Sequence, residues 1–287
     1  MVGKTGDRVQ AVTKFALSFM GRMFDTNIGL ISAGVAFYAM LAVFPGISAT
    51  IAIWSAFADP GIIQSYLQVA DDFIPPEAFA ILNDQIMALM VGPRAALGWG
   101  TVLSVAFALF SARAGVGALV QGLNVIHATK PRNTLWNFLI GYIMTLALVG
   151  VMLVAMATIV IVPVAVNFLP FHDATAWMLS GLPWGAMLLL MLTALGILYR
   201  YGPNTEGHRD PILTVGAVLA TFVWGVASLG LTYYLANFGS YNRVYGSIGA
   251  VIALLMWLYL SAFSVLLGAA LNAELAARRQ ARRKPAQ

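Results

Sequence analysis

Long apolar stretches separated by short polar segments dominate the chain. A helix that crosses about 30 Å of hydrocarbon needs roughly 20 mostly apolar residues. Strands of a membrane β-barrel would instead give short segments in which apolar and polar residues alternate. The pattern therefore predicts an all-α, polytopic integral membrane protein. We expect six transmembrane helices, at about 28–57, 97–121, 137–162, 177–199, 212–236 and 246–273.

The apolar stretch 133–172 is long enough to raise the question of a second span. Two spans would need about 40 residues plus a turn. The loop signals in this stretch, Pro163 and Pro170, both lie near its end. We therefore expect one helix, to about residue 162, followed by an extracytoplasmic tail.

Two segments outside the predicted spans have amphipathic helical spacing. Within 8–24, apolar residues such as Phe19 and Met23 share one face, which predicts a helix on the cytoplasmic membrane surface. It would act as a topology anchor or recognise lipid. The loop 59–96 is divided by Pro75-Pro76 and predicts two short amphipathic helices on the outer surface. They would form a lid over the bundle or a surface for a substrate or partner.

Basic residues fix the predicted orientation. They gather in the N-terminal arm, near 130, at 200–209 and in the tail 277–287, whereas the opposite loops carry only Arg94 and Arg243. Because Lys and Arg accumulate on the cytoplasmic side, both termini are predicted to be cytoplasmic. We expect one membrane domain, 1–276, and a basic cytoplasmic tail.

Composition excludes a soluble globule. Apolar residues make up 60% of the chain, charged residues 9%, and mean hydropathy is +0.84, whereas soluble domains carry about 25% charged residues. The net charge of +5 follows from the topology, so the expected partner is the lipid bilayer rather than nucleic acid. The absence of cysteine from the sequence excludes disulfides and thiolate metal sites.

No pattern in the sequence indicates catalysis. It contains no phosphate-binding lysine loop, no GxSxG elbow and no HExxH zinc motif. His127, His172 and His208 fall in three different loops, with His172 on the opposite side from the others, so a shared metal site is not expected. We expect neither an enzyme nor a cofactor.

Polar and helix-breaking residues inside the spans are candidates for a substrate pathway or for helix packing. Pro45-Gly46 predicts a kink or break in the first span, as in ordinary kinked helices or in transporter binding sites. Arg113, in the last third of the second predicted span, would snorkel to the interface or face an anionic headgroup or acidic partner.

The last span carries a stripe of small and polar residues at a spacing of four, which favours close helix packing. After it, Glu274 and Arg278 form an ordinary i,i+4 pair or, alternatively, Glu274 relays protons. The candidate pathway or packing residues are Tyr38, Pro45, Gly46, Arg113, Asn124, Asn242, Tyr245, Gly246, Ser264, Gly268, Asn272 and Glu274.

Several blocks in order resemble the YihY/BrkB family of bacterial membrane proteins. Residues 32–46 (SAGVAFYAMLAVFPG) resemble its first-span motif, and 122–126 also fit. Three further blocks resemble its C-terminal half, and the likeness runs over about 10–276. These blocks are 198–204 (LYRYGPN), 245–250 (YGSIGA) and 267–274 (LGAALNAE). The chain departs from the family pattern at Gly202 and at Ala270, where an acid is common.

The resemblance implies an inner-membrane protein discussed as a virulence factor or a transporter, including for lipidic cargo. The family also carries an old ribonuclease label, which these residues do not support, because a metal-dependent nuclease needs a His/Asp cluster and a soluble active site. Two hypotheses remain. A translocator of a lipid or amphipathic solute would have a cavity or groove lined by spans one, two and six. A scaffold would be a closed bundle that binds an envelope partner through 59–96. We favour translocation.

Overall fold

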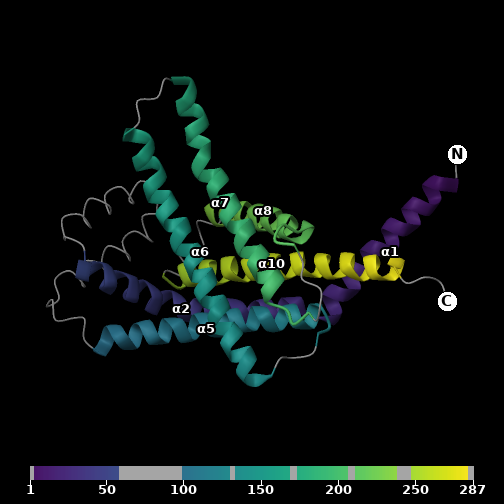
Figure 1. The fold of residues 1–287 in the computed structure, drawn as a ribbon, viewed down its shortest axis with the longest axis horizontal. Coiled ribbons are helices and arrows are strands. Elements are labelled where there is room, and N and C mark those ends of the chain that lie inside the picture. Colours follow the sequence, from purple (N-terminus) through teal and green to yellow (C-terminus); the bar gives the residue numbers. More distant parts are fainter. Residues whose placement is uncertain are drawn as a thin grey trace.

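The computed structural model describes residues 3–57, 99–129, 133–168, 173–205, 211–237 and 247–283. Every regular element in these segments is an α-helix (Figure 1). The predicted loop helices of 59–96, and also Asn242, Tyr245 and Gly246, lie outside the described residues. The helices are α1 (Gly3–Asp25), α2 (Ile28–Phe57), α5 (Trp99–Ile126), α6 (Thr134–Phe168), α7 (Asp173–Tyr201), α8 (Val215–Asn237) and α10 (Ser247–Arg283).

Each of the six predicted spans corresponds to one helix, but several ends differ. α5 ends five residues later than predicted, and α6 continues through Pro163 to Phe168, where a tail was expected. α10 continues to Arg283, so most of the predicted tail 277–287 is helical. This part of α10 consists of Ala, Arg and Gln, which have high helix propensity and therefore favour continuation of the helix.

The described helices are those of a membrane protein. Three of them contain stretches long and apolar enough to cross a membrane: Val102–Ile126, Val215–Ala236 and Val251–Ala281. α6 and α7 contribute shorter apolar stretches, Leu135–Val151 and Gly185–Tyr201. The count of six spans and the orientation stay predictions.

α2 is one continuous helix with Pro45 inside it, so the chain does not break there, and a kink at Pro45 stays a prediction. Proline in a membrane helix is tolerated where neighbouring groups satisfy the freed backbone. The sharp bend lies earlier, where Thr13–Asp25 meets Ile28–Val43 at 50°. Asn27, at this junction, has φ 51°, a left-handed conformation that asparagine adopts more readily than most residues. The chain therefore turns sharply at Asn27, between α1 and α2.

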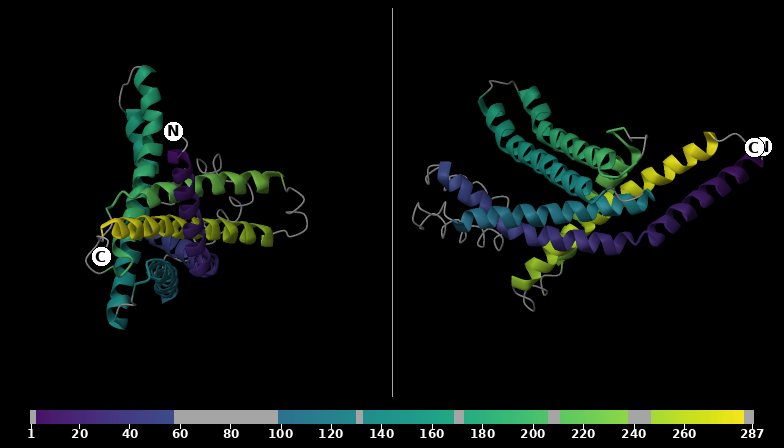
Figure 2. Two further views of the ribbon diagram at one scale, coloured as in Figure 1. Left: turned by 90° about the vertical axis from the view of Figure 1, so that its right-hand side faces the viewer. Right: turned by 60° about the horizontal axis from the view of Figure 1, so that its bottom comes forward.

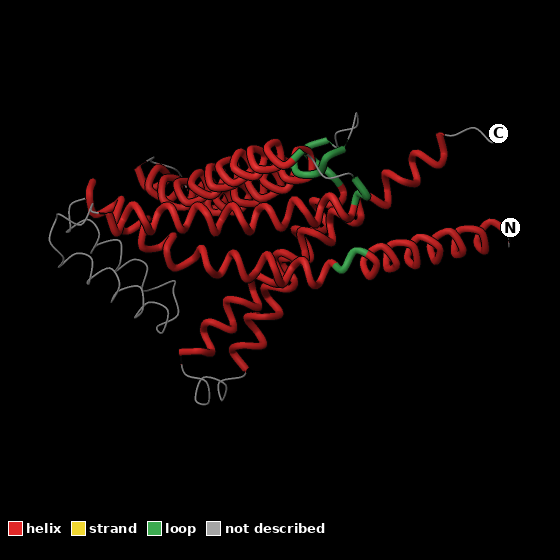
Figure 3. The backbone as a smooth tube through the Cα atoms, turned by 90° about the horizontal axis from the view of Figure 1, so that it is seen from below, coloured by secondary structure: helices red, strands yellow, loops and turns green. Residues whose placement is uncertain are grey.

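The helices form two groups. α2 packs along α5, and α10 packs against both α8 and α2, while α6 pairs with α7 and crosses α5 (Figures 1 and 2). The start of α1 and the end of α10 project from the same end of the molecule (Figure 3). An even number of spans requires this arrangement.

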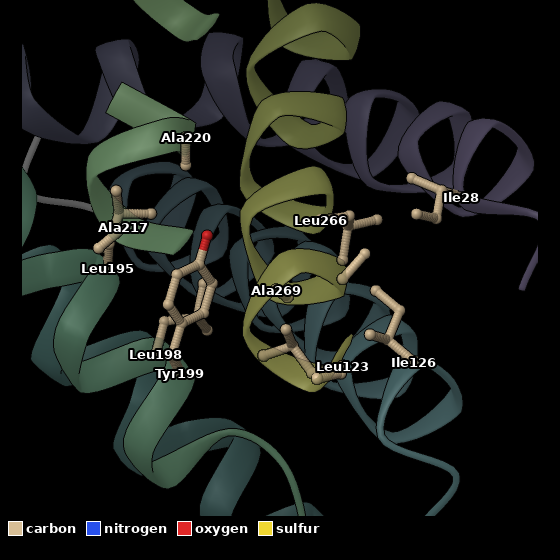
Figure 4. Packing of buried hydrophobic residues seen from close by; sticks show 12 residues of the cluster. Ile28, Leu123, Ile126, Leu195, Leu198, Tyr199, Ala217, Ala220, Leu266 and Ala269 are labelled. Atoms are coloured by element: carbon tan, nitrogen blue, oxygen red, sulfur yellow. The ribbon is translucent and has the colours of Figure 1, made fainter. Parts of the chain in front are cut away.

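The buried core lies where the ends of several helices meet rather than along their full length (Figure 4). Ile28 begins α2, Ile126 ends α5, and Leu198 and Tyr199 lie in the last turns of α7. Elsewhere, large apolar side chains are exposed; Phe222, Leu229 and Tyr233 on α8 are examples. Apolar faces of this extent suit contact with lipid tails.

Candidate functional site

The seam between α8 and α10 accounts for two of the candidate residues. Gly216 and Gly268 bring the two backbones together, since a Cβ on either would collide with the carbonyl oxygen of the other. The Asn272 side chain accepts the Gly216 N–H at 2.8 Å and donates to the Thr214 hydroxyl at 2.9 Å. Thr214 in turn accepts the Ala217 N–H, so Thr214 and Asn272 together cap the start of α8. Gly268 and Asn272 therefore have packing roles.

Two reciprocal hydrogen bonds continue the same seam. Trp224 Nε1 donates to Ser261 Oγ at 3.0 Å, and Trp257 Nε1 donates to Ser228 Oγ at 3.2 Å. In each helix the serine follows the tryptophan by four residues, and this repeated spacing is the signal that could have predicted the pairing. Ser264 hydrogen-bonds the carbonyl of Leu260 within its own helix.

Buried Tyr199 joins α7 to the same seam. Its hydroxyl donates to the Val265 carbonyl at 2.6 Å, and its ring reaches from α7 into the space between α8 and α10 (Figure 4). A Cβ on Gly268 would lie 2.6 Å from this hydroxyl. The missing side chain of Gly268 therefore makes room both for the Gly216 backbone and for the Tyr199 hydroxyl.

Glu274 is a buried carboxylate with two cationic partners. It accepts from Arg278 at 3.1 Å, as the i,i+4 spacing predicts, and from Arg22 of α1 at 3.3 Å. Arg22 also donates to the Ile126 carbonyl at the end of α5, and the Arg278 guanidinium lies 4.5 Å from the Phe15 ring centroid. These contacts tie α1, α5 and α10 together, which is a structural role. Sequence reasoning missed Arg22 because it lies 252 residues away.

Asn124 connects two loops. Its side-chain oxygen accepts the Thr129 hydroxyl at 3.0 Å and the Asn204 N–H at 2.7 Å. The segment that follows α7 is therefore held against the end of α5. Tyr38, on α2, lies beside Gly115, where a Cβ would be 3.6 Å from the Tyr38 Cβ.

Arg113 is a cation inside a long apolar stretch of α5. It lies near the middle of the stretch Val102–Ile126. Its guanidinium carbon is 4.2 Å from the centroid of the Phe138 ring and 5.4 Å from that of Tyr142, both on α6. Cation–π contacts of this kind replace part of the hydration that the cation loses.

The charge of Arg113 has no described counterion. Its Nε is buried and has no hydrogen-bond partner among the described residues. The ion pairs among the described residues are those of Glu274 with Arg22 and Arg278, and neither involves Arg113. The surroundings are apolar and open, since Phe138 is 51% exposed and Phe110, one turn away on α5, is 60% exposed. An anion could therefore approach this guanidinium from the lipid side.

A cleft of about 350 Å³ lies between the first turns of α6 and the end of α7. The translocation hypothesis predicted a cavity lined by spans one, two and six, whereas this cleft is lined by the third and fourth. Neither Trp136 nor Arg200 was among the candidates, although Arg200 lies in the block 198–204. The lining residues are Trp136, Ile140, Ile143, Met144, Arg200, Tyr201, Pro203, Asn204 and Thr205.

Within the described segments, no three His, Asp or Glu side chains lie close enough to hold a metal ion together. Pro45 and Gly46 lie within α2. Of the candidate residues, the structure thus brings Gly268 and Asn272 together at one seam and keeps Arg113, Asn124 and Glu274 apart from it.

Comparison with known proteins places these features in a family. The model of the family described as virulence factor BrkB matches residues 19–287. A UPF0761 membrane protein of Alteromonas mediterranea is 30% identical, over 90% of this chain and 86% of its own length. A ribonuclease-like protein, YfkH, of Bacillus subtilis is 27% identical, over 87% of this chain and 90% of its own length. No solved structure matches the chain.

Proposed function

Since this chain belongs to the BrkB family of membrane proteins, we propose that it translocates an anionic lipid, or a similar amphipathic solute, across the bacterial inner membrane. The observation that supports this proposal best is Arg113, which lies near the middle of an apolar stretch, faces open apolar surroundings and has no described counterion. The proposal includes both termini in the cytoplasm, as the basic loops predict.

The energetics of Arg113 favour an anionic ligand. Placing an arginine at the centre of a membrane helix costs about 2.5–3.5 kcal/mol on insertion scales and more in simulations. A cation–π contact returns about 0.5–2 kcal/mol, so the aromatic rings of α6 offset only part of the cost. A phosphate group would offset the remainder, because guanidinium groups bind phosphate through two parallel hydrogen bonds.

Two other functions have less support. The scaffold hypothesis depends on 59–96, which lies outside the described residues, so no contact in the structure favours it. The ribonuclease-like name belongs to the Bacillus relative. Nothing in the arrangement of this chain's described carboxylates and histidines suggests a nuclease centre.

Translocation is tested in proteoliposomes with fluorescent phosphatidylglycerol and phosphatidylcholine, whose outer-leaflet fraction is bleached by dithionite. The wild-type protein should bring inner-leaflet phosphatidylglycerol to the surface faster than empty vesicles do. Arg113→Gln should slow this movement by about tenfold, the effect of losing a hydrogen bond to a charged group. Arg279→Gln removes an exposed charge and is the matched control. Wild-type rates equal to those of empty vesicles for both lipids would refute the proposal.

A further inference from the structure

The cleft between α6 and α7 is a second site with the chemistry to bind an amphipathic anion. Its α6 wall is apolar, with Trp136, Ile140, Ile143 and Met144. Its other wall, from the end of α7 to Thr205, carries the Arg200 guanidinium and polar groups. A site with one apolar wall and one cationic wall fits a ligand that has an apolar part and an anionic part.

The cleft is separate from Arg113 although both use α6. Residues 136, 140, 143 and 144 recur at three- and four-residue spacing and therefore share one face of the helix. Phe138 and Tyr142, which contact Arg113, lie on the opposite face. A change in the cleft can therefore be made without touching the surroundings of Arg113.

The charges at the cleft favour an anion. Among the described residues that line the cleft, Arg200 is the cationic one and none is acidic. The Arg200 guanidinium carbon lies 5.6 Å from the centroid of the Tyr201 ring. Arginine is suited to phosphate recognition because its planar donors match the oxygens of that group.

The position and size of the cleft favour a lipid headgroup. The cleft lies at the end of α7 and the start of α6, on the side predicted to be cytoplasmic. Trp136 is 59% exposed and Tyr201 is 39% exposed, and such aromatic side chains are typical of the level of lipid headgroups. A volume of about 350 Å³ is near the lower limit of ligand sites, so it would hold a headgroup while the acyl chains stay in the bilayer.

We propose that this cleft binds the phosphate-bearing headgroup of an anionic phospholipid of the cytoplasmic leaflet. Arg200 binds the phosphate, and Trp136 packs against the apolar part of the same lipid at the membrane interface. This inference goes beyond translocation, because a resting lipid occupies the cleft whether or not any lipid crosses the membrane.

The test measures lipid binding to the full-length protein in detergent by native mass spectrometry. Phosphatidylglycerol should bind more tightly than phosphatidylcholine. Arg200→Gln should weaken phosphatidylglycerol binding by about tenfold, as expected for a lost charge-assisted contact. It should weaken phosphatidylcholine binding less, because the choline cation of that lipid partly neutralises its phosphate. Arg200→Lys should restore part of the preference, and Arg279→Gln should preserve it.

Glycerophosphoglycerol distinguishes a lipid from a soluble phosphate ester, because it presents the phosphodiester headgroup of phosphatidylglycerol without acyl chains. It should compete only weakly, and competition as strong as that of the lipid would overturn the assignment to a phospholipid. Equal phosphatidylglycerol affinities of wild type and Arg200→Gln would overturn the site itself.

A second measurement does not depend on the folding of any variant. Wild-type protein is irradiated with phosphatidylglycerol that carries a diazirine near its headgroup. Peptides that contain Trp136 or 199–205 should be labelled, and labelling elsewhere without these peptides would contradict the proposal. If the wild-type protein binds lipid in this cleft but moves none across the membrane, translocation is refuted and the lipid site in the cleft is supported. If it moves lipid but its lipid binding does not depend on Arg200, the lipid site is refuted and translocation is supported.

Discussion

At the scale of single residues, several polar side chains of the described segments hydrogen-bond backbone groups. Asn272 binds the Gly216 N–H, Tyr199 binds the Val265 carbonyl, and Asn124 binds the Asn204 N–H. Unpaired polar groups are costly away from water, so such side chains are matched to specific backbone atoms. Arg113 differs, because its Nε has no described partner.

The stripe of Ser264, Gly268 and Asn272 shows how far sequence reasoning reaches at this scale. The spacing of four correctly indicated close packing, because residues so spaced share one helix face. It predicted neither the partner helix nor Thr214 as the second hydrogen-bond partner of the Asn272 side chain. Those contacts join residues far apart in the chain, which local periodicity does not encode.

Gly268 provides a prediction at this scale. Gly268→Ala should destabilise the protein by about 1–3 kcal/mol, because the added methyl would collide with the Gly216 carbonyl and the Tyr199 hydroxyl. Gly225→Ala is the matched control on α8, where a Cβ meets nothing within 4 Å. The control should be neutral or stabilise by about 0.5–1 kcal/mol, since alanine favours helices. Unfolding midpoints in detergent measure both, and equal midpoints would disprove the close-packed seam.

At the scale of elements, α1 is attached to the bundle more firmly than its amphipathic pattern alone predicts. The pattern placed Phe19 and Met23 on one apolar face, and the structure packs both against the core. Leu17, Met20 and Phe24 remain exposed. Whether these residues lie on a membrane surface stays a prediction, whereas the attachment through Arg22 and Glu274 is visible.

The attachment of α1 gives a second prediction. Glu274→Gln should loosen α1, because both Arg22 and Arg278 lose their charged partner, and hydrogen bonds to charged groups contribute about 1.5–3 kcal/mol each. Hydrogen–deuterium exchange over 13–25 should then speed up, while exchange in α8 should not change.

Two comparisons make this exchange experiment decisive. Arg22→Gln should accelerate exchange in α1 similarly, because it removes the other half of the contact between α1 and α10. Arg279→Gln, an exposed change on the same helix as Glu274, should have no effect. Unchanged exchange in both Glu274→Gln and Arg22→Gln would show that this ion pair does not hold α1.

The ends of elements were predicted less well than their presence. Continuous apolar runs located all six helices, since they follow from the thickness of hydrocarbon. The continuation of α10 to Arg283 and of α5 to Ile126 was missed, because hydropathy marks where a span leaves the apolar layer and not where the helix ends.

At the scale of the whole molecule, the two chain ends project together (Figure 3). With six spans this predicts a shared compartment. A fluorescent protein fused after Gln287 should fluoresce and an alkaline phosphatase fused there should be inactive, because the fluorescent protein folds on the cytoplasmic side and the phosphatase does not. Reporters inserted between 59 and 96 should give the opposite pattern. An active phosphatase at the C-terminus would refute the predicted topology.

The sequence by itself determined that this protein lies in a membrane, that its helices are long and apolar, and which family it resembles, because hydrophobic length and ordered motifs are local properties of the chain. Tertiary structure alone decided that Arg22 reaches Glu274, that Arg113 contacts two aromatic rings of α6, and that Arg200 and Trp136 line one cleft. Those pairings depend on how the helices cross. In the apolar interior of a membrane, hydrophobicity does not determine which face of an apolar helix packs against its neighbours. Small residues and rare polar contacts therefore select the crossings, and their partners are known only once the helices are placed.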